Sequence, residues 1–405
     1  MNVLSMAFDG LHQCCRFNPK VLSCDRVYSD STNTDLSAQV IPLNRDLDTI
    51  YFIGTGGTIS AVPSEHGFLP EYDLPQLINK YVEFEHDSVT RFCFPAPGTP
   101  RHFGKLLDST NIKLVDQIRL ANLIEEVLQN VHPSGIVVTH GTDTMAFTAS
   151  MLSLLIPNPT KPIVLTGAMR SFVEPNSDAS KNVRDAVAVA KSKTIQPGVY
   201  VVFNGRIIPG PWVTKIGLDD LDSFRSIYAG QDIGRVDGKI ITLFAGMKTD
   251  YEPKDQVIIR DYKIPLTEVL IDTIVIHPGL TPKQLDSLIS KSIGHGIIIR
   301  GYGSGALPED LLPIVKEHAQ LKPIIVDTQV PLRGGGGAKY AVEQSVLRAG
   351  IMTAHGLSQA MALNAFRFVL AEHGDSLPAI KQAWDGVCTR WGSGPIMPPE
   401  IQAVG

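Results

Sequence analysis

Short apolar runs alternate with helix-spaced apolar residues along most of the chain after residue 46. The runs expected to form buried strands are 49–53, 135–139, 162–165 and 199–203. The segments with a helical apolar period are 111–130, 145–155 and 179–191. Asp178 stands directly before the last of these segments and is expected to cap its helix. Alternating strands and helices predict an α/β domain built on a largely parallel sheet.

The same alternation resumes near residue 266 and predicts a second α/β unit. Its expected strands are 269–276, 296–300 and 323–327. Thr281 and Pro282 supply an N-cap and a first-turn proline for a helix over 282–292, and Ser358 opens a helical pattern that runs to Leu370.

The predicted fold is therefore α/β, with a larger N-terminal doubly wound domain at 47–235 and a smaller C-terminal α/β domain at 266–405. Residues 1–46 are polar and irregular, so they are expected to be an extension outside the main fold. The charged segment 236–265 lacks a helical period and is expected to be the connector.

Composition narrows the class of protein. A chain of 405 residues with 43% hydrophobic and 19% charged residues can bury a substantial core. The net charge of -5 argues against a nucleic-acid binder. Neither a membrane-spanning apolar stretch nor a secretory signal stands out, which predicts a cytoplasmic protein.

The five cysteines are odd in number and lack paired CxxC elements. Reduced thiols are therefore favoured over a disulfide framework or a metal site formed by Cys14, Cys15, Cys24 and His12. We expect no metal and no cofactor.

The run Gly54-Thr55-Gly56-Gly57-Thr58-Ile59 follows the first expected strand directly. A strand that ends in a glycine-rich turn presents backbone amides and hydroxyls at the carboxyl edge of the sheet, where ligands bind in open α/β sheets. Thr58 would offer an oxygen nucleophile there. The alternative is a plain turn or a phosphate loop, although the run lacks both the GxGxxG spacing and a P-loop ending.

A second polar turn, His140-Gly141-Thr142-Asp143-Thr144, follows the strand expected at 135–139. Its hydroxyl and carboxylate groups would face the same sheet edge as Thr58, or else Thr142 or Asp143 would simply cap the next helix. Lys215 lies in the loop after 199–203; it is either solvated or folded back onto this edge, where a lysine can act on a hydroxyl.

These elements resemble the bacterial asparaginase/glutaminase family, and most closely its cytoplasmic type I branch. TGGTI and HGTDTM are the two family signatures, and the likeness extends over about residues 48–372. Further similar segments are DSTN (108–111), LTGAMRS (165–171), VTK (213–215), HPGLT (277–281) and GYGSG (301–305).

The resemblance implies an asparaginase-like fold and a threonine mechanism. Thr58 would be the nucleophile that forms an acyl-enzyme and releases ammonia. Thr142, Asp143 and Lys215 would form a triad that polarises the site and positions water, and Asp143 would also pair with the substrate's α-ammonium. The implied substrate-binding positions are Gly57, Ser109, Thr110, Gly141, Ala168 and Ser304.

Two positions depart from the family pattern. The family tyrosine of the loop after TGGT is Phe68 here, which has no hydroxyl to relay a proton, and Tyr72 could replace it only if the loop folded differently. Ser304 stands where many relatives carry asparagine, and Arg333 lies in a loop that lines the family site. Together these residues suggest a non-standard substrate.

The leading function is hydrolysis of a side-chain carboxamide on a small molecule such as asparagine or glutamine. The alternatives are a tailoring enzyme or acyltransferase that uses the same acyl-enzyme, the ammonia-generating component of a tRNA-dependent amidotransferase, and a catalytically weak amino-acid-binding homologue. By resemblance, we expect a homodimer or homotetramer whose partner is a small amide, with no nucleic acid and no membrane.

Overall fold

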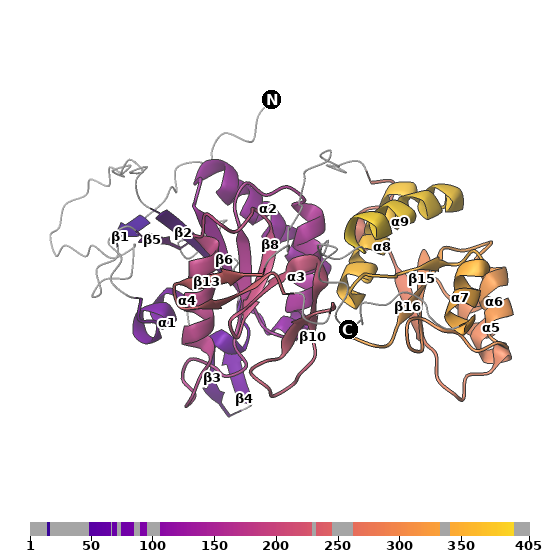
Figure 1. Ribbon diagram of the computed structural model, residues 1–405, viewed down its shortest axis with the longest axis horizontal. Coiled ribbons are helices and arrows are strands. Elements are labelled where there is room, and N and C mark those ends of the chain that lie inside the picture. Colours follow the sequence, from indigo (N-terminus) through magenta and orange to yellow (C-terminus); the bar gives the residue numbers. More distant parts are fainter. Residues whose placement is uncertain are drawn as a thin grey trace.

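The computed structural model describes residues 14–16, 48–65, 67–70, 74–84, 90–94, 106–228, 232–244, 262–332 and 341–392. They form two α/β domains that lie side by side (Figure 1). Each domain has its own sheet, of nine strands in the first and four in the second. The predicted fold class is confirmed.

The larger sheet has a parallel centre. Its strands, in spatial order, are β1 (Cys14–Arg16), β5 (Thr90–Cys93), β2 (Asp48–Gly54), β6 (Gly135–Thr139), β7 (Ile163–Thr166), β8 (Val199–Phe203), β9 (Arg206–Pro209), β12 (Gly234–Asp237) and β13 (Ile240–Leu243). Strands β5, β2, β6, β7 and β8 run parallel. The predicted strands β2, β6, β7 and β8 are thereby confirmed.

Helices cover both faces of this sheet. Alternate strand residues point to opposite faces, so Tyr51 and Ile53 pack with α2 (Leu114–Asn130) and α3 (Met145–Leu155). Ile50 and Phe52 pack on the other face with α1 (Leu74–Tyr81) and α4 (Ala179–Ala190). Because both faces are buried, the central strands read as continuous apolar runs in the sequence.

The edges of the sheet differ from the sequence prediction. Strand β1 lies within the residues predicted to be an irregular extension and pairs antiparallel with β5. Cys93 in β5 is disulfide-bonded, so the preference for reduced thiols was wrong at this residue. Strand β13 and the last two residues of β12, Val236 and Asp237, fall within the segment predicted to be the connector. In β12 the charged Arg235 and Asp237 alternate with the buried Gly234 and Val236, which suits a position near the sheet edge.

The second sheet is parallel throughout, in the order β14 (Ile271–Val275), β15 (Gly296–Gly301), β16 (Ile324–Thr328) and β17 (Met352–Thr353). The helices α5 (Pro282–Lys291), α6 (Leu312–His318) and α7 (Ala341–Arg348) pack on one face, and α8 (Gln359–His373) and α9 (Leu377–Trp391) on the other. Thr281 caps α5 with a capping box and Ser358 caps α8, as predicted.

Helices α3 and α8 join the two domains. Met151 of α3 belongs to the same apolar core as Phe366 of α8. Asn364 of α8 donates to the Phe147 carbonyl at 3.0 Å and to the Ser150 hydroxyl at 2.7 Å. These buried hydrogen bonds fix one domain against the other. No helix in the described part of the chain could span a bilayer.

Candidate active site

The first glycine-rich turn continues β2 and is tied to its neighbours through the backbone. Thr55 donates its amide to the Thr139 carbonyl at 3.0 Å, and Gly57 donates to the Leu107 carbonyl at 2.8 Å. Gly56 and Gly57 have φ of 106° and 84°, which glycine adopts without strain. Thr58 follows at once, half-buried, as the first residue of the 3-10 helix η1 (Thr58–Ser60).

The two threonine-bearing turns meet at their glycines. A Cβ atom on Gly57 would lie 2.2 Å from the Cα of Gly141, and one on Gly141 would lie 2.5 Å from both the Cβ and Oγ of Ser109. Only glycine leaves room for these three segments to approach one another. Thr58 and Thr142, each the next residue along its turn, are therefore brought to the same sheet edge, as predicted.

Lys215 folds back onto the second turn. Its Nζ donates to Thr142 Oγ1 at 2.9 Å and to Asp143 Oδ1 at 2.7 Å. The lysine side chain is only 16% exposed, whereas that of Asp143 is 52% exposed. Of the two interpretations of Lys215, the solvated one is wrong, and the structure assembles the hydroxyl, carboxylate and amine.

A salt-bridge network holds the hairpin that carries Lys215. Strand β10 (Val213–Lys215) pairs antiparallel with β11 (Phe224–Ser226), and Asp222 lies in the loop between them. Arg206 donates to both oxygens of Asp222, at 2.6 and 2.9 Å, and to Asp232 at 2.6 Å. This bidentate pairing, together with Arg225, holds the pKa of Asp222 well below its usual range.

Ser109 links the loop before α2 to the second turn. Its Oγ accepts from the Asp143 amide at 3.3 Å, and its carbonyl accepts from Thr144 Oγ1 at 2.8 Å. Ser109 is buried, whereas Thr110 is exposed and donates its hydroxyl to Asp108 at 2.9 Å. Ser109 thus joins the site, and Thr110 lies beside it with its hydroxyl engaged.

The alternative that Thr142 or Asp143 caps helix α3 is wrong. Thr144 occupies the N-cap position of α3 and makes no side-chain capping hydrogen bond. The Thr142 and Asp143 side chains are held by Lys215 instead. Their polar groups are therefore directed to the sheet edge and do not satisfy the helix terminus.

Ala168 lies in a turn whose backbone is held by hydrogen bonds to the buried carboxylate of Asp178. Asp178 accepts from the amides of Met169 at 3.1 Å and Arg170 at 2.9 Å, and from Asn182 Nδ2 at 2.9 Å. Asp178 is the N-cap residue of α4, as predicted, but its side chain makes no capping bond there. The carboxylate instead accepts hydrogen bonds from the turn that contains Ala168.

His140 is a site-forming residue to which the sequence assigned no role. It is buried, with Nδ1 2.7 Å from the Gly141 carbonyl and Nε2 2.9 Å from Thr148 Oγ1. A carbonyl only accepts, so Nδ1 carries the proton and Nε2 accepts from Thr148, whose oxygen accepts from Gln117 at 3.1 Å. Burial lowers the pKa of His140 to about 4, although the Gly141 hydrogen bond opposes this shift.

The remaining predicted site residues are Ser304, Phe68, Tyr72 and Arg333. Ser304 is exposed in the turn after β15 of the second domain. The backbone of Phe68 lies in β4 (Gly67–Pro70), which pairs with β3 (Ala61–Ser64), but its side chain is outside the described part of the structure. Tyr72 and Arg333 also lie outside the described residues. Within those residues, no three His, Cys, Asp or Glu side chains gather as a metal site would need.

Comparison with known proteins finds two matching family models. Residues 49–247 match the N-terminal asparaginase domain, and residues 270–383 match the glutaminase/asparaginase C-terminal domain. The L-asparaginase of Thermococcus kodakarensis is 33% identical over 338 residues, which cover 80% of this chain and 93% of that protein. The chain belongs to the asparaginase family. It is accordingly an amidohydrolase of the class that acts on linear amides.

Solved structures of this family share the fold. The thermostable L-asparaginase from T. kodakarensis matches with a TM-score of 0.66 at 30% identity, over 83% of this chain and 96% of that chain. A probable cytoplasmic L-asparaginase from Campylobacter jejuni matches with a TM-score of 0.63 at 23% identity, over 83% of this chain and 99% of that one. One component of the glutamyl-tRNA(Gln) amidotransferase of Pyrococcus furiosus is 30% identical and is covered over 75% of its length.

Proposed function

We propose that this asparaginase-family protein hydrolyses the side-chain carboxamide of a small amino-acid-like molecule through a threonine acyl-enzyme. The observation that carries the proposal is the placement of Lys215 Nζ, 2.9 Å from Thr142 Oγ1 and 2.7 Å from Asp143 Oδ1. A partly buried amine that hydrogen-bonds to a hydroxyl and a carboxylate can take part in acid–base chemistry beside a nucleophile. The close approach of the Gly57 and Gly141 backbones supports a position for Thr58 beside this triad.

In the first step, Thr58 Oγ adds to the amide carbon. The C–N bond then breaks, the departing nitrogen takes up the proton lost by Thr58, and ammonia leaves. Water adds to the resulting ester, the ester C–O bond breaks, and the acid product and free Thr58 are restored. Thr142, Asp143 and Lys215 polarise the site and position that water.

The developing oxyanion requires donors that are already in place. Within the described residues, the Ala168 amide makes no hydrogen bond, whereas the next two amides, of Met169 and Arg170, are bound by Asp178. A rigid turn with one unused N–H suits an oxyanion donor. We assign this role to the Ala168 turn, together with the backbone near Thr142.

The substrate's α-groups are assigned to Asp143 and Ser109. The Asp143 carboxylate is half-exposed, so its free oxygen can accept from an ammonium group. Ser109 Oγ accepts from the Asp143 amide and keeps its own proton, which it can donate to a carboxylate. Gly57 and Gly141 allow the two threonine-bearing turns to approach each other, and their backbones would line the substrate site.

Assembly and location belong to the same proposal. Ser304 is exposed on the second domain, and the family resemblance implies that this domain completes the active site of a neighbouring copy. We therefore propose a homodimer or homotetramer, working in the cytoplasm. Light scattering during size-exclusion chromatography measures the assembly, and a monomer with full activity would contradict it.

Phe68 favours a second candidate, action on a non-standard amide or transfer of the acyl group to an acceptor other than water. Phenylalanine cannot relay a proton at the position of the family tyrosine. Phe68→Tyr is expected to raise the rate with asparagine if that relay alone is missing. Ammonia release without any added acceptor separates hydrolysis from acyl transfer.

The decisive test is an ammonia-release screen with asparagine, glutamine and their β- and γ-amide derivatives. Wild type should release ammonia from at least one compound, and Thr58→Ala should reduce this rate by at least about 1,000-fold. Thr160→Ala, an exposed threonine outside the site, is the matched control and should behave as wild type. Equal rates for wild type and Thr58→Ala would overturn the proposal.

A further inference from the structure

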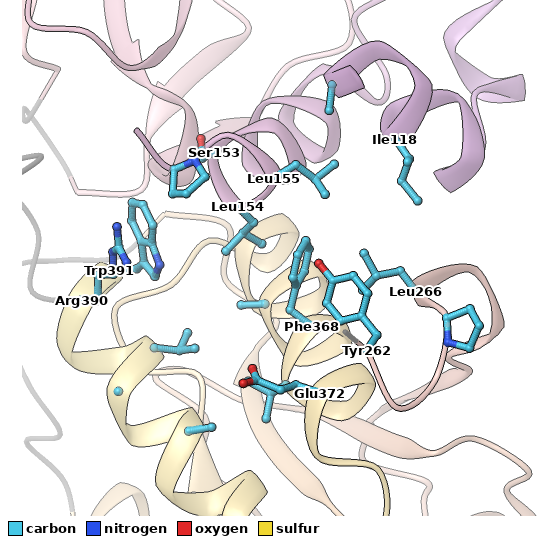
Figure 2. Close-up of a pocket in the computed structure, with 18 of the residues that line it drawn as sticks. Ile118, Ser153, Leu154, Leu155, Tyr262, Leu266, Phe368, Glu372, Arg390 and Trp391 are labelled. Atoms are coloured by element: carbon cyan, nitrogen blue, oxygen red, sulfur yellow. The ribbon is translucent and has the colours of Figure 1, made fainter. Parts of the chain in front are cut away.

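A cavity of about 650 Å³ lies between the two domains. Its walls come from α2 and α3 of the first domain, α8 and α9 of the second, and the segment 262–267 (Figure 2). Apolar side chains supply much of the wall, among them Leu154, Leu155, Leu266 and Phe368. Small-molecule sites commonly have volumes of ~300–1,000 Å³ and often form between domains.

The cavity is separate from the candidate active site. Thr58, Thr142, Asp143 and Lys215 do not line it. Helix α3 begins just after the second threonine turn, whereas its last residues, Ser153–Leu155, form the cavity wall. At 1.5 Å per residue, the two ends of α3 lie about 16 Å apart.

Gly386 keeps one wall of the cavity open. It lies within α9, and two residues at helical spacing from it, Ala383 and Arg390, line the cavity with it, as does its neighbour Val387. A Cβ atom on Gly386 would meet no heavy atom within 4 Å, and the residue does not adopt a positive φ. Neither packing nor backbone conformation requires glycine here, although glycine weakens a helix interior relative to alanine. Gly386 is exposed, so it leaves this side of the cavity open to solvent.

Two polar groups face this apolar space. Burial, together with the charge of Glu372, raises the pKa of Tyr262 to about 12, so its hydroxyl stays protonated at neutral pH. That hydroxyl makes no hydrogen bond to any residue in the described part of the chain. The ion-pair partner of Glu372, Nε2 of His373, lies 3.8 Å away, beyond hydrogen-bond distance. Both groups can therefore contact a ligand.

The carboxylate of Glu372 favours a cationic ligand. The basic lining residue Arg390 has its guanidinium 5.0 Å from the centre of the Trp391 ring. We propose that the cavity binds a small amine with an aromatic or branched aliphatic body, its ammonium group directed to Glu372.

The test is calorimetric titration of the full-length protein with 2-phenylethylamine, and with 3-phenylpropionate as the anionic counterpart. The amine should bind saturably with one site per chain, and the anion at least about tenfold more weakly, because it faces Glu372. Gly386→Leu, which fills the open space, should weaken amine binding by about tenfold or more. Gly386→Ala, which adds only a methyl group in the same helix, is the matched control and should bind within about twofold of wild type.

Glu372→Gln gives a second measurement that does not depend on filling the cavity. It should lower amine affinity about tenfold and reduce the preference for the amine over the anion. Melting temperature and ammonia release verify that each variant is folded. Failure of the amine to saturate, or equal binding by wild type and folded Gly386→Leu, would overturn the proposal. So would a change of oligomeric mass in Gly386→Leu without amine binding, because the cavity would then belong to a subunit contact. If a variant loses ammonia release but still binds the amine, that result contradicts the proposed catalysis and not the proposed amine site.

Discussion

Gly57 and Gly141 touch through their backbones, so closely that a methyl carbon on Gly57 would lie 2.2 Å from the Gly141 Cα. The two residues are 84 positions apart, and each directly precedes a threonine of the candidate site. The parallel pairing of β2 with β6 places both turns at one sheet edge. This contact, more than any side-chain interaction, determines how near Thr58 and Thr142 can lie.

Gly57→Ala should therefore disable the site. The added methyl must push the Gly141 backbone away, and an alanine at a φ of 84° is strained. Since a displacement of about 1 Å at a reacting group can cost about 100-fold in rate, we expect at least that loss in kcat/KM for ammonia release. Gly238→Ala is the control: its φ is 58° but nothing lies within 4 Å of an added Cβ. Equal activity losses in both variants would contradict the role of the contact.

Lys215→Met should remove the amine while keeping much of the side chain's length. Thr142 and Asp143 then lose hydrogen bonds of 2.9 and 2.7 Å, and we expect kcat to fall by about 100- to 10,000-fold. Circular dichroism and the unfolding midpoint should stay close to wild type, because a partly exposed ion pair contributes little to stability. Lys161→Met, at an exposed lysine outside the site, is the matched control. A Lys215→Met enzyme with wild-type kcat would exclude the triad.

The main elements could be predicted from the sequence because their apolar periods are local. The central strands β2, β6, β7 and β8 are buried on both faces, so their continuous apolar runs identified them. The capping signals at Thr281 and Ser358 depend on nearest neighbours and were also correct. Short edge strands such as β1 and β13 carry no such pattern, because pairing with a distant strand determines them.

The site was harder to predict because its geometry joins distant segments. Thr142 and Lys215 are 73 residues apart, and no local pattern shows that the β10–β11 hairpin turns Lys215 inward. Asp178 was correctly placed at the start of α4, yet its carboxylate binds the turn of Ala168. His140 received no role, although its position after the mostly apolar strand β6 was a signal of burial.

Asp222→Asn tests the salt-bridge network that supports Lys215. Arg206 would lose one of its two carboxylate partners and keep Asp232, so the β10–β11 hairpin should loosen, and we expect kcat to fall about tenfold with a smaller change in KM. Asp219→Asn makes the same charge change at an exposed position of the same loop and should retain wild-type kinetics.

Because Arg206 lowers the Asp222 pKa in the folded protein, the stabilisation from this ion pair is present at neutral pH and is lost as pH falls below about 4. Urea unfolding from pH 3 to 7 should show a weaker acid dependence in Asp222→Asn than in Asp219→Asn; parallel curves would contradict the network.

His140 should make stability depend on pH in a higher window. Its folded pKa is about 4, below the ordinary value of 6.5, so between these pH values the unfolded chain holds a proton that the folded chain excludes. Stability should therefore decrease as pH falls from 6.5 toward 4, by up to about 3 kcal/mol. Glutamine does not titrate, so the free energy of unfolding of His140→Gln should change less across that window. Its stability at pH 7 can still be lower, because the hydrogen bonds to Thr148 and Gly141 are lost. Urea titrations at several pH values measure both slopes, with the exposed His277→Gln as control. If His140→Gln and His277→Gln lose stability equally with acid, His140 is not the group that titrates, and another buried residue must account for the dependence.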